Sequence, residues 1–106
     1  MNLVHTASSL PGAWESAVLA EVGTAAVKVL RMDGRPLPPE AHATAEALVV
    51  VDGRLELVVD GEDFTIESGE LCRIPGGAVH AVRPGSRGTL LIIEVPAPAS
   101  SGTINS

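Results

Sequence analysis

Short apolar runs alternate with turn-forming residues along most of the chain. Asp33-Gly34, Asp60-Gly61 and Pro84-Gly85 stand between runs rich in Val, Leu and Ile. Such pairs are typical of tight turns, because Gly adopts positive φ without a steric penalty and Pro presets φ. Many short strands at this spacing predict an all-β sandwich or barrel. The strands that we predict are Ala17–Val22, Ala25–Met32, Ala45–Val51, Leu55–Asp60, Asp63–Ile66, Glu70–Ile74, Ala78–Arg83 and Thr89–Val95.

Two hairpins are predicted in the middle of the chain. Asp52-Gly53 has the composition of a type I′ turn and is flanked by the apolar runs Leu48–Val51 and Leu55–Val59. Asp60-Gly61 has the same composition and would join the next pair of strands. Helical periodicity is hard to find, and we expect at most one turn of helix, over Thr6–Leu10.

Two runs, Val49–Val51 and Leu90–Ile93, are apolar at consecutive positions rather than at alternating ones. Strands of this kind are usually covered on both faces. The chain has 106 residues, which predicts a single domain that we place at residues 1–95. In a domain this small we expect the second cover to be a twin subunit, so the sequence predicts a homodimer. Pro96–Ser106 is rich in Ala, Pro and Ser, and we expect an extended or disordered tail there.

The charge and composition exclude several classes of partner. The formal net charge is −6, and the 7 Lys and Arg residues are scattered, so a phosphate backbone would be repelled and no nucleic-acid partner is expected. No apolar stretch approaches the roughly 20 residues of a membrane helix, and we expect no signal peptide. Cys72 is the single cysteine, so we expect a cytoplasmic protein and assign Cys72 a buried apolar role.

Ionisable side chains converge on the predicted core from one segment. Glu40, His42 and Glu46 have the same parity as Leu48 and Val50, so an extended strand would point all five to one face. Burying even a neutral polar group without a partner costs about 2–7 kcal/mol. A divalent metal ion would resolve this cost, because imidazole nitrogen and carboxylate oxygen are suitable ligands.

A second candidate histidine, His80, follows a turn further along the chain. A tight turn at Pro75-Gly76-Gly77 is expected to deliver His80 onto the next strand, facing the barrel interior. His5, in contrast, lies near the N-terminus in no recognisable motif, and we treat it as a surface residue.

The two segments together resemble the cupin superfamily. Its first motif, G-x5-H-x-H-x3-4-E-x6-G, matches residues 34–53 in spacing, with Glu40 at the first His position. Its second motif, G-x5-P-x-G-x2-H-x3-N, matches residues 69–84, with Pro84 at the closing Asn. The resemblance implies a double-stranded β-helix, or jelly-roll barrel. It also implies that Glu40, His42, Glu46 and His80 bind one metal ion inside the barrel.

The departure at Glu40 bears on the identity of the metal, which we leave open among Mn, Fe, Ni and Zn. Two carboxylates favour harder ions such as Mn²⁺ or Fe²⁺. If Glu40 points away, His42, Glu46 and His80 still have the composition of a 2-His-1-carboxylate triad. A site that has lost its metal is the remaining alternative.

Function follows from the resemblance only as a choice between two hypotheses. The first is a metal-dependent enzyme, dioxygenase-like or isomerase-like, that acts on a small, possibly anionic, organic molecule. Glu46 or Glu40 would then serve as general base. The second is a non-enzymatic cupin that binds or senses a small ligand, with a structural or vestigial metal site. Lys28, Arg31 and Arg73 are candidates for a cation facing an anionic substrate, and Trp14 is expected to close the barrel end or the dimer seam.

Overall fold

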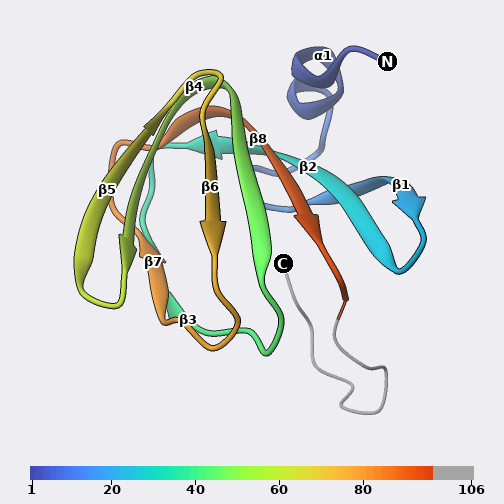
Figure 1. Ribbon diagram of the computed structural model, residues 1–106. Coiled ribbons are helices and arrows are strands. Elements are labelled where there is room, and N and C mark those ends of the chain that lie inside the picture. The colour runs from blue at the N-terminus through green and yellow to red at the C-terminus, as the bar shows by residue number, and fades with distance from the viewer. Residues whose placement is uncertain (97–106) are drawn as a thin grey trace.

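The apolar runs form strands that curl into a half-open antiparallel barrel (Figure 1). The computed structural model describes residues 1–96, so nearly all of the predicted tail lies outside the described residues. The elements are α1 (Leu3–Ser8), β1 (Ala17–Val22), β2 (Ala25–Asp33), β3 (Leu37–Glu40), β4 (Glu46–Val59), β5 (Glu62–Glu67), β6 (Leu71–Ile74), β7 (His80–Val82) and β8 (Arg87–Glu94). No helix in this part of the chain is long and apolar enough to cross a membrane.

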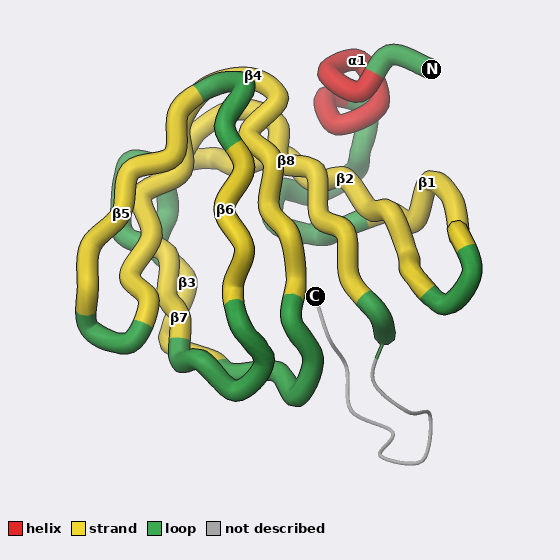
Figure 2. Tube along the Cα trace, in the orientation of Figure 1, coloured by secondary structure: helices red, strands yellow, loops and turns green. Residues whose placement is uncertain are grey.

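The long strand β4 belongs to both walls of the barrel. Its first half pairs with β6 on one side and β8 on the other, and β8 continues through β2 to β1. Its second half pairs with β5 and β7, and β7 pairs with β3. Figure 2 shows how the strands curl around a common interior. The predicted all-β, antiparallel barrel class is confirmed by this strand order.

The predicted hairpin turn at Asp52-Gly53 is wrong. β4 runs through both residues without a break, and Gly53 lies opposite Gly88 of β8. A Cβ on Gly53 would collide with the carbonyl oxygen of Arg87, so this glycine serves a close approach of two backbones at positive φ. The Asp60-Gly61 turn is confirmed: both residues have positive φ and join β4 to β5.

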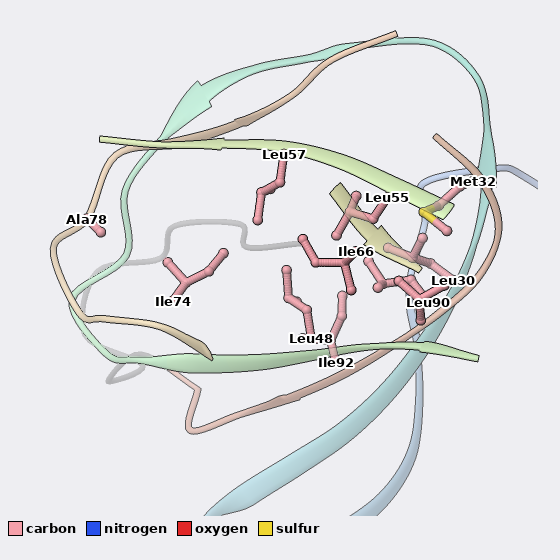
Figure 3. Close-up of a cluster of buried hydrophobic side chains, with 11 residues drawn as sticks. Leu30, Met32, Leu48, Leu55, Leu57, Ile66, Ile74, Ala78, Leu90 and Ile92 are labelled. Carbon is pink, nitrogen blue, oxygen red and sulfur yellow. The ribbon is translucent and has the colours of Figure 1, made fainter. Parts of the chain in front are cut away.

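A β-bulge inside β4 keeps its apolar residues pointing inward through the bend. The register with β8 shifts between Val50 and Asp52, where β4 has one residue more than its partner. The buried positions therefore change parity, from Leu48 and Val50 before the bulge to Leu55 and Leu57 after it. Figure 3 shows side chains from both walls meeting in one core.

Strand β3 was not predicted, because the segment holds Pro38 and Pro39, which have no N–H for a ladder hydrogen bond. It lies at the edge of the sheet beside β7, where proline is tolerated. Helix α1 begins earlier than the expected turn and packs near β2, with Arg31 donating hydrogen bonds to the carbonyls of Ala7 and Leu10. On the outer face of β8, where a twin subunit was predicted to pack, Leu91 is half-buried and Ile93 is exposed. The homodimer stays a prediction.

The close approach at Gly53 can be tested by substitution. Gly53→Ala is expected to lower the free energy of unfolding by more than about 3 kcal/mol, because it adds a backbone collision to the strain of positive φ. Gly61→Ala is the matched control: its φ is +83 against +88 for Gly53, but nothing lies within 4 Å of the added methyl. It should cost only about 1–2 kcal/mol. Equal losses in urea denaturation would contradict the role of Gly53.

Candidate metal centre

The four predicted ligands line one pocket at the end of the barrel where β3 ends and β4 and β7 begin. Glu40 ends β3, Glu46 begins β4 and His80 begins β7, while His42 lies in the loop between β3 and β4. Glu40 and His80 are partners in the β3–β7 ladder, which brings the two motifs side by side. The convergence therefore comes from strand pairing and a loop, and not from the single continuous strand that the shared parity predicted.

The imidazole of His42 lies between two carboxylates. Its Nδ1 is 3.0 Å from Oε2 of Glu46, and its Nε2 is 2.6 Å from Oε1 of Glu40. Burial by itself would lower the pKa of His42, but the two hydrogen bonds and the two negative charges outweigh it and raise that pKa. The imidazole thus bridges the two carboxylates, which favour its protonated form.

The turn of the second motif supports the loop that carries His42. The backbone N–H of Gly77 donates to the carbonyl of His42 over 2.7 Å. A Cβ on Gly76 would lie 2.5 Å from the carbonyl oxygen of Ala43, so only glycine allows the two loops to touch. The Gly-Gly pair therefore positions the His42 loop as well as His80.

His80 is buried and has one ring nitrogen directed at the cluster. Its Nδ1 lies 3.2 Å from the carbonyl of Ala78, an arrangement that places a proton on Nδ1 and leaves the Nε2 lone pair free. That Nε2 is 3.9 Å from Oε1 of Glu46. The rings of His42 and His80 meet edge to face with centroids 5.1 Å apart.

These donors fit a divalent ion. One ligand atom from each of Glu40, His42 and His80 lies within 4.8 Å of the others. Two ligands bound at about 2.1 Å to one ion lie about 3–4.2 Å apart, so small side-chain movements would suffice. Glu46 lies at the other ring nitrogen of His42 and 3.9 Å from Nε2 of His80, and its donor atoms form a separate cluster with those of His42 and Glu94. Glu40 is more exposed than the other three, yet it points into the cluster.

Two further charged residues lie beside this set and were not predicted as part of it. Glu94 is opposite Glu46 in the β4–β8 ladder, and it forms a second cluster of donor atoms with His42 and Glu46. The Nζ of Lys28 is 2.7 Å from Oε2 of Glu94, and both residues are buried. The parity that Glu94 shares with the core residue Ile92 could have revealed it.

A pocket opens above the four ligands. It is lined by Trp14, Leu30, Leu37, Pro38, Leu48, Leu55, Leu57, Ala81, Val82, Leu90 and Ile92 together with the ligands. Among the described residues that line it, none is Lys or Arg. Lys28 is engaged by Glu94, Arg31 holds the helix end, and Arg73 is exposed on β6. The pocket thus combines one polar, acidic end with apolar walls.

Comparisons with known proteins agree with this arrangement. Over 60 residues the chain is 40% identical to quercetin 2,3-dioxygenase of Bacillus subtilis (strain 168), a stretch that covers 56% of this chain and 18% of that enzyme. A cupin-2 domain containing protein from Shewanella frigidimarina superposes with a TM-score of 0.81 and 26% identity, over 91% of this chain and 94% of that one. The protein NMB1881 from Neisseria meningitidis gives a TM-score of 0.78 at 21% identity, over 91% and 98% of the two chains.

The family model described as cupin domain matches residues 29–96, a range that holds all four predicted ligands and both motifs. This match spans more than half of the chain, and the strand order agrees with it. The chain therefore belongs to the cupin family.

Proposed function

We propose that this protein binds one divalent metal ion through Glu40, His42, Glu46 and His80 and uses it to act on a small organic molecule. The observation that carries the proposal is the imidazole of His42 held between two carboxylates, with a second imidazole edge-on beside it. Such a group of ionisable side chains at the base of an apolar pocket is typical of a functional site.

The chemistry that we favour is dioxygenation or isomerisation. A bound ion would supply Lewis acidity toward an oxygen of the substrate, or a site for dioxygen. The partial match to a quercetin 2,3-dioxygenase supports an oxygenase, although this chain spans less than a fifth of that enzyme's length. Glu40 is the residue that we propose as general base, because it is the most exposed of the four and already holds a ring nitrogen of His42.

One observation favours a second candidate, a non-enzymatic module that binds a small ligand. Apart from the four ligands, the described residues that line the pocket offer no carboxylate, imidazole, hydroxyl or amine. If Glu40 stays bound to the ion, no side chain in the pocket remains to accept a proton. A Glu40 that dissociates from the ion thus favours an enzyme, and a closed set of four ligands favours a binding module.

Metal content and thermal stability test the site. The wild-type protein is expected to carry close to one equivalent of a divalent ion by elemental mass spectrometry. An ion present at 100 times its Kd should stabilise the fold by about 2.7 kcal/mol. His42→Ala and His80→Ala should each lose the ion, whereas His5→Ala, which removes an exposed histidine, should keep it. A wild type that takes up no ion and gains no stability from added ions would refute the proposal.

The affinity for the ion should depend on pH in a defined direction. A proton and a metal ion compete for the ring of His42, whose pKa is raised by Glu40 and Glu46 against the effect of burial. Affinity should therefore fall as the pH drops below that raised pKa, by up to about tenfold per pH unit. Glu40→Gln removes one of the groups that raise the pKa, so the fall should begin at lower pH. Chelator competition from pH 5 to 9 measures both proteins.

The ion pair of Lys28 and Glu94 is expected to keep Glu94 out of the ligand set. Lys28→Met would leave the buried Glu94 charge unpaired next to Glu46 and should lower the free energy of unfolding by about 3–5 kcal/mol. Lys28→Met with Glu94→Gln should recover most of this loss. Arg54→Met breaks an exposed pair with Glu67 and should cost less than about 1 kcal/mol. Urea denaturation measures all three, and a cost for Lys28→Met as small as that control would contradict the prediction.

A further inference from the structure

Trp14 forms part of the pocket wall although it lies far from both motifs in the sequence. It belongs to the segment between α1 and β1 and packs against the apolar core. It lines the same pocket as His42 and His80, together with Leu30 and Leu37. The N-terminal segment thus brings an aromatic surface to a site whose other parts come from the barrel strands.

Several contacts fix the indole in this position. The backbone N–H of Trp14 donates to the carbonyl of Arg31 over 2.8 Å, and its Nε1–H donates to Oδ1 of Asp33 over 2.8 Å. Hydrogen bonds from Arg35, and the bond from the indole itself, hold the pKa of Asp33 far below its usual range, so this acceptor stays ionised. The indole N–H is therefore already satisfied, and the ring can offer the pocket only apolar contact.

The backbone at Trp14 adds a second observation. Its φ is +65, in the left-handed region that a bulky aromatic residue rarely adopts. Such a conformation persists only where the surrounding structure imposes it, and it occurs most often at functional sites. Here the two hydrogen bonds from Trp14 to β2 impose it. The strained turn has one evident result, which is to hold the indole in the wall of the pocket.

The polarity of the pocket then limits the molecules that fit. Away from the four ligands, the lining side chains are aliphatic, proline or the indole of Trp14. A hydroxyl group on the body of a ligand would lose its water and find no partner there. The part of the pocket that is open to a water-sized atom has a volume of about 60 Å³.

We infer that Trp14 is a specificity-determining residue, which selects small molecules with one oxygen-bearing head and an apolar body and rejects polyhydroxylated ones of equal length. The head would bind at the metal and the body would pack against the indole. This inference rests on the proposed function, because it takes the metal centre as the place of the head. It goes beyond that function in naming the chemical class of the ligand and the residue that selects it.

A matched pair of acids tests this selectivity. Butyrate and 3-hydroxypropanoate have the same number of heavy atoms and the same carboxylate head, and only the second carries a hydroxyl on its body, in place of the terminal methyl of butyrate. Each is titrated into the zinc-loaded protein. The chain contains one Trp and no Tyr, so the emission of Trp14 reports on the pocket alone. Butyrate is expected to shift this emission and to bind at least about tenfold more tightly than its hydroxy analogue.

Variants connect the selectivity to the indole. Trp14→Ala, followed by isothermal titration calorimetry, should reduce the preference for butyrate below about threefold, while the affinity for zinc stays within about twofold of wild type. Trp14→Phe keeps an aromatic wall and should retain most of the preference. If Trp14→Ala fails to fold, the emission shift in the wild type and the Trp14→Phe titration still decide the question.

The outcomes separate this inference from the proposed function. If zinc does not bind the wild-type protein, the proposed metal centre fails. If zinc binds but the two acids bind equally, if neither acid binds, or if Trp14→Ala keeps the full preference, the inference about Trp14 is overturned and the metal centre stands.

Discussion

Glu46 and Glu94 face each other across the β4–β8 ladder, and both side chains are more than nine-tenths buried. Like charges directly opposite in a sheet repel each other, and burial increases the repulsion. Each of the two carboxylates has one basic side chain as its partner. Lys28 reaches Glu94 from β2, and the imidazole of His42 reaches Glu46 from the loop before β4. These two contacts join β2 to β8 and the His42 loop to β4 at this end of the barrel.

The two basic partners, Lys28 and His42, differ in whether a metal ion can replace them. Lys28 binds Glu94 as a permanent partner, since its ammonium group has no role other than this ion pair among the described contacts. His42 is a replaceable partner, because its proton can be exchanged for a metal ion at the same nitrogen. A divalent ion would balance Glu40 and Glu46 together, whereas the protonated ring balances only one of them. Glu94 keeps its permanent partner Lys28, whereas the partner of Glu46 can be replaced. Glu46 is therefore the carboxylate that is available as a ligand.

The sequence predicted the parts of this protein that depend on local spacing. Both motif gaps brought four ionisable side chains to one pocket, and the turn at Asp60-Gly61 was predicted because its composition is typical of a tight turn. Asp52-Gly53 has the same composition, but its glycine serves a backbone contact with Gly88 that no local pattern reveals. Glu94 and Trp14 were not assigned to the site, because strand pairing and a segment distant in sequence bring them there.

Charge balance also determines how a ligand would be held. With Glu94 neutralised by Lys28, an ion bound between Glu40 and Glu46 leaves a site of no net charge, and no Lys or Arg lines the described pocket. An anionic head would therefore be held by coordination to the ion, with little long-range attraction from the protein. Most of the remaining binding energy must come from apolar contact between the body of the ligand and the walls. Trp14 has the largest side chain among the described residues that line the pocket, and its hydrogen bonds to β2 hold it in place. A ligand would thus meet weak electrostatic attraction at its head and a rigid apolar surface along its body.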